Sequence, residues 1–453
     1  MAATSTNADR PARGAELELT VDSLAYGGAG VARLDGYVVF VHGAIPGDRV
    51  RAVVDKRKRS YAEARALEVL EPSAERIAPL AAHPGAPWQV LPYERQLEAK
   101  QSQVQEALRR IARLDSYELE PIVPASEQWR YRNKLEYSFG ADREGRLTCG
   151  FHAPGRWDQI VELDDCMLAS TPGNAAREQI VRWCREQRLA AYDRRTGEGL
   201  LRNLVVREGR RTGQLLVRLV TSTGQLERAS LAAAAEGLHG LLWTRLDGVA
   251  ESTQGGETEL IAGADRLDEE LAGMRFRISA EAFFQTNTEM AERLYGLAIE
   301  YAEPHGSERA YDLYCGIGTI GLLLAPRVAE VWGLELVPEA ISDAIANARA
   351  NEIDNAHFFA GDVRLALREL TGRAGRPDLL VVDPPRAGLS QKVVRRLIEA
   401  APRRIVYVSC NPTTLAPNAA QLVEAGYRLR RLRPVDMFPQ TPHIECVALL
   451  ERR

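Results

Sequence analysis

The sequence has little cysteine and no long apolar run. Six cysteines are spread over 453 residues without a CxxC pair, at positions 149, 166, 184, 315, 410 and 446. This spacing argues against a disulfide framework and favours reduced thiols. No apolar stretch is long enough for a bilayer-spanning helix, and the polar start MAATSTNADR has no secretory signal core. We therefore expect no membrane insertion and a cytoplasmic location.

The chain also has little net charge, only −4, whereas a nucleic-acid partner requires clustered Lys and Arg. A small net charge does not exclude local clusters of basic residues. Arg51 and the run from Lys56 to Arg59 crowd one short stretch, which makes Lys56 and Arg57 candidate nucleic-acid contacts. The alternative interpretation of such a run is a solvated turn.

The length of the chain predicts several domains, because one core seldom serves more than roughly 200 residues. Residues 1–14 are small and polar and are expected to form a disordered tail. Residues 15–72 alternate apolar and polar positions between glycine-rich turns, which predicts a small closed β-barrel. Through Tyr26-Gly27-Gly28, VHGAIPGDRV and the basic hairpin ending at Tyr61, the segment resembles the TRAM domain. The resemblance implies an OB-like barrel that binds RNA.

Residues 73–275 mix a helical pattern with short strand patterns, which predicts an α+β central domain. Its first part, about 89–114, has the amphipathic spacing of a surface helix. Two basic segments suit phosphate and base contacts, with a solvated strand face as the alternative. They are Arg132, Asn133 and Lys134, together with the later pair Arg202 and Asn203.

From residue 276 to 453, strand-like and helix-like segments alternate, which is typical of a parallel doubly wound sheet. The expected fold class is therefore multidomain α/β: an OB-like barrel, an α+β central domain and a C-terminal Rossmann-like domain. Within the last domain, DLYCGIGT follows a strand and opens a helix, a position where glycine permits close approach of a ligand. The loop fits G-x-G-x-x-G as well, so alone it leaves dinucleotide binding open.

Four segments in a fixed order decide between a dinucleotide and another nucleotide-type cofactor. They are DLYCGIG, ELVPEAI, GDV and DPPR. Together they resemble class I methyltransferases. The resemblance implies that S-adenosylmethionine is the cofactor, with Glu335 on the ribose and Asp362 near the adenine. The full set of residues implied to line the cofactor site is Gln285, Tyr314, Gly316, Gly318, Thr319, Glu335, Asp362 and Asp383.

A cysteine after the strand IVYVS suggests covalent chemistry. Cys410 lies at the carboxyl end of a strand, where open α/β sheets bind ligands, and SCNP begins a helix whose start favours a thiolate. Pyrimidine C5 is a poor nucleophile unless a thiolate first adds at C6, and a base must then remove the C5 proton. Glu445 is the candidate base. The alternatives are a structural cysteine and a solvated carboxylate.

The segments VSCNPTTLAPN, DMFPQTPHIECVALLERR, FFQTNTEMAERLY and YRNKLEYSF together resemble the RNA uracil-5 methyltransferase family over residues 15–453. The resemblance implies that Cys410 is the nucleophile and Glu445 the proton-abstracting base. It also implies that Gln285 lies near cofactor and target base, and that Asp383 lies between methyl donor and uracil. Packing roles are assigned to Cys315 and Cys446.

The sequence departs from many relatives in one respect. Residues 76–96 hold no cysteine where those relatives carry iron–sulfur ligands, and Cys166 matches only the last ligand. A cluster needs several thiolates, which His83 cannot replace, so neither a cluster nor another metal is expected. The loss leaves the local fold near 80–90 open.

The expected partner is RNA, with large-subunit ribosomal RNA favoured because relatives with a TRAM barrel mostly act there. No membrane or obligate protein partner is indicated. The alternatives are uracil-5 methylation of transfer RNA, an amino-group methyltransferase that uses the DPP loop, and a non-catalytic RNA-binding protein. The amino-group enzyme differs in needing no cysteine, because its substrate nitrogen already carries a lone pair.

Overall fold

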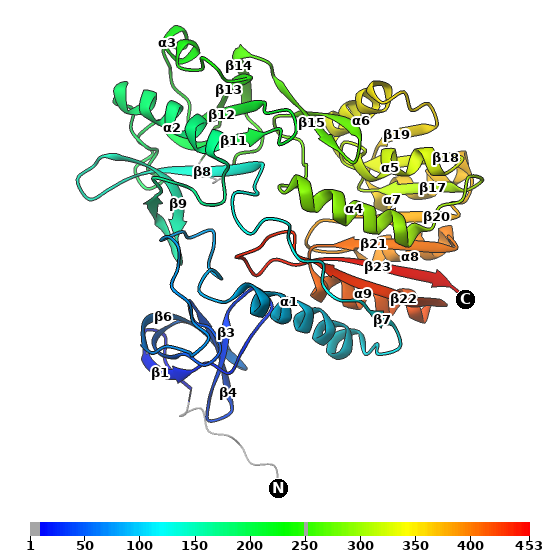
Figure 1. Ribbon diagram of the computed structural model, residues 1–453, viewed down its shortest axis with the longest axis horizontal. Helices are drawn as coiled ribbons and strands as arrows, with labels where there is room; N and C mark the ends of the chain where they lie inside the picture. The colour runs from blue at the N-terminus through cyan, green and yellow to red at the C-terminus, as the bar shows by residue number, and fades with distance from the viewer. Residues whose placement is uncertain (1–9, 249–251) are drawn as a thin grey trace.

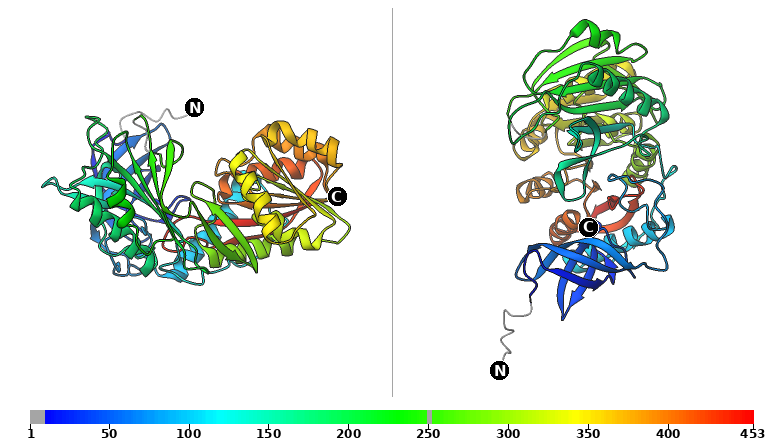
Figure 2. Two further views of the ribbon diagram at one scale, coloured as in Figure 1. Left: turned by 90° about the horizontal axis from the view of Figure 1, so that it is seen from above. Right: turned by 90° about the vertical axis from the view of Figure 1, so that its left-hand side faces the viewer.

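The computed structural model describes residues 10–248 and 252–453 in three parts (Figure 1). Most of the tail expected at 1–14 lies outside the described residues. A barrel and a central domain lie on one side of the molecule, and a C-terminal domain lies on the other, as Figure 2 shows from above. Among the residues described, no helix combines the length and apolar composition needed to cross a membrane.

The N-terminal part is a six-stranded barrel-like sheet in the order β1-β5-β6-β4-β3-β2. Alternate residues of its strands face inward, so that side chains such as Leu19, Val39 and Val50 form a small core. The parallel pairing of β4 with β6 joins the β1-β5-β6 half of the sheet to the β4-β3-β2 half. The strands are β1 Glu16–Thr20, β2 Ser23–Leu24, β3 Gly30–Leu34, β4 Tyr37–His42, β5 Arg49–Arg57 and β6 Tyr61–Glu71.

The central domain is a seven-stranded sheet in the order β10-β9-β8-β11-β12-β13-β14. Helix α2 (Thr171–Glu186) packs on one face, and the Ser170 hydroxyl accepts the Gly173 N–H at its start. The short helix α3 (Arg228–Ala233) also belongs to this part. The strands are β8 Lys134–Ala141, β9 Leu147–Ala153, β10 Arg156–Glu162, β11 Leu201–Glu208, β12 Leu215–Thr221, β13 Gly240–Arg245 and β14 Glu257–Gly263.

The C-terminal domain contains an eight-stranded sheet in the order β19-β18-β17-β20-β21-β23-β22-β7. Five parallel strands alternate with helices, as predicted, and the final hairpin inserts β23 antiparallel to β21. The strands are β7 Glu118–Leu119, β17 Arg309–Leu313, β18 Glu330–Glu335, β19 Ala356–Ala360, β20 Leu379–Val382, β21 Arg404–Ser409, β22 Tyr427–Val435 and β23 Glu445–Arg452.

Helices cover both faces of this sheet. One face packs against α4 (Thr288–Ala302), α5 (Thr319–Leu324) and α6 (Pro338–Ala350), with η2 (Ala325–Arg327) following α5. The other face packs against α1 (Tyr93–Ala107), η1 (Leu108–Ala112), α7 (Val363–Ala374), α8 (Gln391–Ala400) and α9 (Pro412–Glu424). These apolar layers leave the ends of the parallel strands as the place for polar chemistry.

Two segments counted with the central domain in the sequence pack elsewhere. Helix α1 packs against α9 and β22, and β7 pairs with β22, so residues 93–119 join the C-terminal sheet. The hairpin of β15 (Arg266–Leu271) and β16 (Met274–Ser279) forms a separate two-stranded sheet against α6. The predicted boundary at 276 thus falls inside β16. Both contacts join distant parts of the chain, which local patterns do not reveal.

Candidate active site

Four candidate side chains gather at one edge of the C-terminal sheet because parallel strands all end there. Tyr314 follows β17, Glu335 ends β18, Asp383 follows β20 and Cys410 follows β21. The strands bearing them are neighbours in the sheet. The structure therefore brings the predicted cofactor residues and the predicted nucleophile to a common edge.

Cys410 and Glu445 come together through the antiparallel strand β23. Ser409 pairs with Cys446, so the next positions in this register set Cys410 opposite Glu445. Directly opposed residues of an antiparallel pair have Cβ atoms about 5 Å apart. Glu445 is buried, whereas Cys410 is partly exposed and is the one cysteine of the six that is not buried. The Cys410 thiol is thus accessible, and the Glu445 carboxyl is shielded from water.

Burial, together with the carboxyls of Glu445 and Asp383, raises the pKa of the Cys410 thiol to about 12, although Arg386 acts to lower it. The expectation that the start of the next helix favours a thiolate is therefore wrong for the protein alone. Helix α9 begins at Pro412 with Asn411 as its cap, and the Asn411 side chain accepts the Thr413 N–H. Burial among acids outweighs the helix dipole here.

Three carboxyl groups surround this edge with raised pKa values. Burial raises the pKa of Asp383 to about 7 and, together with the charge of Asp383, raises that of Glu445 well above its usual value. Asp312 has a pKa raised to about 8 by burial, although its Oδ2 accepts the Gly321 N–H at 2.8 Å. Tyr295 on α4 is buried beside them and hydrogen-bonds Gln285. Asp312 opens the segment DLYCGIGT and Tyr295 ends the segment FFQTNTEMAERLY, but neither residue was assigned to the site from the sequence.

The glycine-rich loop has the backbone geometry that a bound nucleotide-like group requires. Gly318 has φ +85°, and a Cβ there would meet Phe358 at 2.9 Å, so glycine is needed for packing. Gly316 has φ +53°, and a Cβ there would meet no atom within 4 Å. Tyr314 also adopts a positive φ, of +62°, which is uncommon outside glycine and typical of functional loops. Thr319 is buried as the first residue of α5.

The residues beyond the loop fit S-adenosylmethionine. The Glu335 carboxylate accepts the N–H groups of Gly316 at 3.2 Å and Leu336 at 2.7 Å, so it lies beside the loop and can accept ribose hydroxyls. Leu336 is 62% exposed, and Val337 after it is exposed as well, which provides an apolar surface suited to adenine. The exposure of Leu336 and Val337 was not predicted from the sequence. Asp362 caps α7 by accepting the Arg364 N–H at 2.8 Å.

Gln285 is buried in the segment between β16 and α4, and Asn133 holds that segment. The Asn133 amide donates to the Gln285 carbonyl and to the Thr288 hydroxyl, both at 2.9 Å. Asn133 was predicted to contact RNA. Since it is buried and its amide hydrogens bond to protein, the structure instead makes it a support for Gln285.

The segment from Asp436 to Glu445 is held by buried polar contacts with α1. Lys100 donates to Asp436 at 2.5 Å, and Tyr93 donates to the same carboxylate at 2.8 Å. Gln96 and Gln440 exchange two hydrogen bonds, of 2.8 and 2.9 Å. The helix predicted to be a surface element therefore buries one polar face. These contacts fix the segment that leads to Glu445.

The barrel also reaches this site. Tyr26 donates a hydrogen bond to the Cys410 carbonyl at 3.3 Å and interacts with Arg386. A Cβ on Gly28 would lie 2.8 Å from Pro442, which shows how closely the barrel turn packs on the segment before Glu445. The glycine-rich turn that marked the barrel in the sequence thus contacts both the Cys410 segment and the segment before Glu445.

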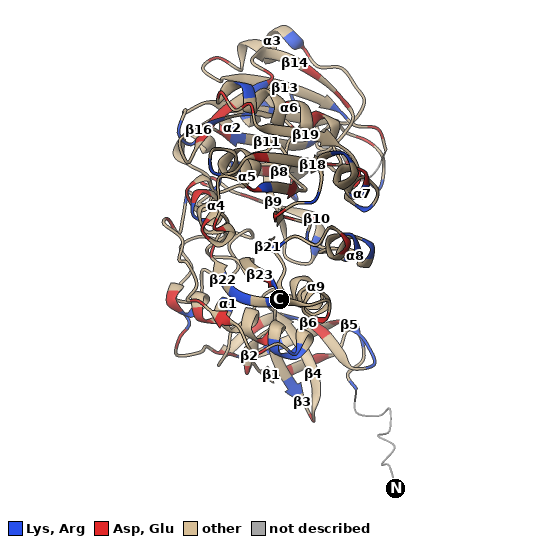
Figure 3. Cartoon of the chain, turned by 90° about the vertical axis from the view of Figure 1, so that its right-hand side faces the viewer, with Lys and Arg blue, Asp and Glu red and all other residues tan. Residues whose placement is uncertain are grey.

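The other predicted RNA contacts lie on several surfaces. Lys56 pairs with Glu63 at 3.1 Å, and Arg57 is exposed at the end of β5, where the ribbon in Figure 3 is coloured blue for Lys and Arg. Arg132 is partly exposed, with its guanidinium 5.8 Å from the centre of the Phe438 ring. Lys134 has a pKa lowered by burial and by Arg207, while Glu136 pairs with it at 2.7 Å.

Hydrogen bonds organise the stretch near 80–90 that the sequence left open. The Gln89 side chain accepts the Leu80 N–H at 3.0 Å and donates to the Ala81 carbonyl at 2.8 Å. His83 Nε2 lies 3.2 Å from the Cys166 sulfur. Within the described ranges, no group of three or more His, Cys, Asp or Glu side chains is arranged to hold a metal ion.

Comparisons with known proteins agree with this architecture. Residues 213–453 match the tRNA (Uracil-5-)-methyltransferase family model, and residues 11–67 match the TRAM domain model. An RNA methyltransferase of Halalkalibacterium halodurans is 37% identical over 96% of both chains. Another, from Thermosynechococcus vestitus, is 39% identical and covers 97% of this chain and 98% of its own.

A solved structure is similar over nearly the whole chain. The Pyrococcus abyssi tRNA (uracil-54, C5)-methyltransferase, in complex with S-adenosyl-L-homocysteine, shares 28% identity and a TM-score of 0.77. The match covers 96% of this chain and 99% of the other. The expected cofactor and fold class are thereby confirmed. The chain belongs to the tRNA (uracil-5-)-methyltransferase family and is an S-adenosylmethionine-dependent RNA methyltransferase with an N-terminal TRAM domain.

Proposed function

We propose that the protein methylates C5 of a uridine in RNA, with Cys410 as the covalent nucleophile and Glu445 as the base. The observation that carries the proposal is the register of β21 and β23, which sets Cys410 opposite Glu445 at the cofactor edge of the sheet. An accessible thiol beside a shielded carboxyl is the pair that C5 chemistry requires.

The reaction begins at Cys410. Its thiolate forms a bond to C6 of the uracil, and the electron pair of the C5–C6 double bond moves toward C5 and the O4 carbonyl. S-adenosylmethionine supplies an electrophilic methyl group on a positively charged sulfur. Because Cys410 has a pKa of about 12 in the protein alone, its thiol must first give its proton to water, which reaches the partly exposed side chain. Arg386, which lowers that pKa, favours the thiolate.

Glu445 completes the reaction. After C5 gains its methyl group, the remaining C5 proton passes to the Glu445 carboxylate, the C5–C6 double bond returns, and the bond from C6 to the Cys410 sulfur breaks. A carboxylate in a buried site is a stronger base than one in water, since burial raises the pKa of Glu445. The nearby Asp383 carboxyl contributes to the same effect.

The remaining predicted residues act in binding. Glu335 accepts the ribose hydroxyls, Asp362 lies near the adenine, and Gln285 and Asp383 orient the uracil and the methyl donor. The backbone of the loop holds the cofactor through Tyr314, Gly316, Gly318 and Thr319. Lys56, Arg57, Arg132 and Lys134 bind RNA phosphates, each from a surface that is distinct from the cofactor loop.

The target was expected to be large-subunit ribosomal RNA because a TRAM barrel is present. The archaeal enzyme that matches 96% of this chain is a transfer RNA enzyme, and that coverage includes most of the barrel region. The barrel is therefore compatible with both RNAs. Both are presented to the protein in the experiment below.

The test uses the full chain, S-adenosylmethionine and transcripts containing 5-fluorouridine, because fluorine at C5 cannot leave as a proton. Transcripts of transfer RNA and of large-subunit ribosomal RNA are compared on denaturing gels, and the modified peptide is identified by mass spectrometry. We expect an adduct at Cys410 with one of them. Cys410→Ala should abolish the adduct, and the matched control Cys184→Ala, in the buried face of α2, should keep it.

Glu445→Gln extends the test to the second half of the reaction. With ordinary uridine, this variant should accumulate a methylated covalent complex, because the C5 proton has no base. Methylation that survives in Cys410→Ala would contradict the covalent mechanism and would favour the amino-group reaction of the DPP loop.

A further inference from the structure

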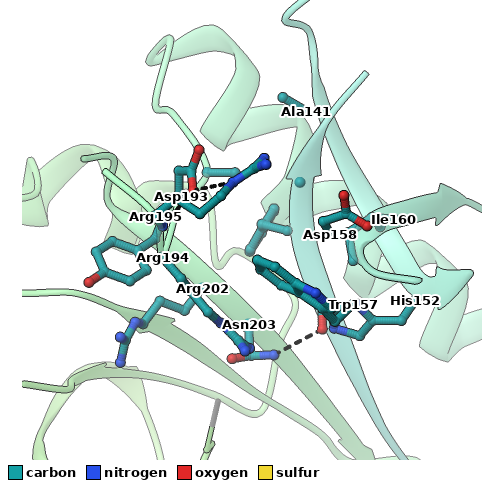
Figure 4. A pocket seen from close by; sticks show the side chains of 15 residues that line it. Ala141, His152, Trp157, Asp158, Ile160, Asp193, Arg194, Arg195, Arg202 and Asn203 are labelled. Atoms are coloured by element: carbon teal, nitrogen blue, oxygen red, sulfur yellow. Dashed lines mark hydrogen bonds and ion pairs between the residues drawn. The ribbon is translucent and has the colours of Figure 1, made fainter. Parts of the chain in front are cut away.

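A second polar pocket lies in the central domain, apart from the methyltransferase edge. It is a cavity of about 200 Å³ between the strands β8, β10 and β11 and the segment from 191 to 195. In Figure 4, Trp157, Asp158 and His152 come from one side, while Asp193, Arg195, Arg202 and Asn203 come from the other. None of these side chains has a part in the proposed methyl transfer.

Two walls of the pocket present flat groups. Trp157 on β10 is 56% exposed, although burial of a large aromatic side chain is favourable. The Arg195 guanidinium lies 5.8 Å from the centre of its ring. Across the pocket, the Arg202 guanidinium lies 4.5 Å from the centre of the Tyr192 ring. Aromatic rings and guanidinium planes are the groups on which proteins stack unpaired bases.

The lining also offers hydrogen-bonding groups of both kinds. Asn203 and Ser138 are opposed in the register of β11 and β8, and the Asn203 amide donates to the Ser138 hydroxyl at 3.2 Å. Asp158 accepts a hydrogen bond from the Arg156 guanidinium at 3.0 Å, and this contact lowers the pKa of its carboxyl. Asp193 lies 3.6 Å from Arg195. Such a mixture suits the edge of a base, which carries donors and acceptors side by side.

The pocket continues toward the catalytic segment on the same face of the sheet. Ser138 and Lys134 alternate onto that face of β8, and Asn203 and Arg207 lie opposite them on β11. Along a strand, four residues span about 13 Å. At the far end, Arg207 donates to the Ala282 carbonyl at 2.7 Å, three residues before Gln285. This strand face, on which Lys134 pairs with Glu136, therefore joins the pocket to the segment that carries Gln285.

We propose that this pocket binds an unpaired nucleobase of the RNA substrate, at a position separate from the methylated uridine. The proposal rests on the proposed function for the identity of the substrate. The flat walls stack on the base, the polar groups contact its edge, and Arg194, Arg195 and Arg202 supply positive charge for the neighbouring phosphates. A cavity of about 200 Å³ suits a single base and excludes a duplex.

The experiment measures binding of two fluorescently labelled single strands to the full-length chain at fixed salt. One is a dodecauridylate, and the other is an abasic twelve-mer with the same backbone charge. Stacking of one base on an aromatic side chain is worth 1–3 kcal/mol, so Trp157→Ala should weaken dodecauridylate binding about 5- to 150-fold. Binding of the abasic strand should stay unchanged, since it has no base to lose.

Two variants serve as controls. Trp157→Phe keeps a flat ring and should retain most of the affinity, while Leu260→Ala removes an exposed apolar side chain from β14, at the opposite edge of the same sheet, and should change nothing. Equal affinity of Trp157→Ala and the wild-type chain for dodecauridylate would overturn the proposal. So would an equal loss for both strands, since that result indicates backbone contacts alone.

The two proposals fail separately. Dodecauridylate binding needs no methyl transfer, so it reports on the pocket even if no 5-fluorouridine adduct forms. Conversely, the wild-type chain could form the 5-fluorouridine adduct while Trp157→Ala binds dodecauridylate with unaltered affinity. That combination would support the methyl transfer and refute the pocket.

Discussion

Replacing Lys100 with methionine tests how the segment that carries Glu445 is held. Both Lys100 and Asp436 are fully buried, and their charged groups lie 2.5 Å apart. Burial lowers the pKa of Lys100, and Asp436 opposes that shift. Removing one partner of a buried pair typically costs about 3–5 kcal/mol, because the other charge is left without compensation. Lys100→Met should therefore leave Asp436 as an unpaired buried acid.

The assay is native-state hydrogen exchange of residues 436–445, which reports the free energy of local opening. A loss of about 3–5 kcal/mol corresponds to exchange faster by roughly two to nearly four decades. Lys56→Met is the matched control, since Lys56 pairs with Glu63 on an exposed strand face, where a pair contributes about 0–1 kcal/mol. The double variant Lys100→Met/Asp436→Asn removes both charges and keeps an acceptor for Tyr93, so protection should partly return. Equal exchange in Lys100→Met and Lys56→Met would refute this reasoning.

Three further predictions concern the site. In the protein alone, the rate at which iodoacetamide alkylates Cys410 should rise about tenfold per pH unit from pH 7 to 10. Only the thiolate reacts, and the pKa of this thiol is about 12. A rate that reaches a plateau by pH 8.5 would contradict the raised pKa. Tyr26→Phe should slow adduct formation about 2- to 13-fold without weakening RNA binding, whereas Tyr37→Phe, which removes a donor to Lys58 on the same barrel, should not. The raised pKa of Asp312, about 8, gives stability that is present below about pH 4 and lost as pH rises through 8. The midpoint of urea unfolding should therefore differ less between pH 5 and pH 8 in Asp312→Asn than in the unsubstituted chain. An equal pH dependence in both proteins would show that Asp312 is not its source.

The fold class and the place of Cys410 at the ligand edge of the sheet could be predicted from the sequence because both have local signals. Alternating strands and helices identify the doubly wound sheet, and a cysteine directly after a buried strand lies at the ligand edge by topology alone. The partnership of Cys410 with Glu445 is not local. It depends on β23 inserting beside β21, which the sequence suggests only through family resemblance.

Burial of polar side chains was the least predictable property. Asn133 lies in a basic cluster that suits RNA, yet its amide contacts a segment 152 residues away. Lys100 occupies the charged face of an amphipathic pattern, yet its partner Asp436 is 336 residues away. In the same way, the start of a helix predicts a lower thiol pKa, but burial of Cys410 and the acids that other strands place beside it raise that pKa instead. Each of these depends on long-range packing, which local patterns do not contain.

The contact between α1 and the end of the chain has a consequence for synthesis on the ribosome. Gln96 and Gln440 are 344 residues apart, so at 5–20 residues per second the helix emerges roughly 20–70 s before its partner segment. During that interval, the apolar side chains of α1 and η1 that pack against α9, such as Val104 and Leu108, and the edge of β7 are exposed without their native neighbours. Chaperone binding to nascent chains is therefore expected to concentrate on residues 93–119 and to end when the last hairpin, β22 and β23, is released.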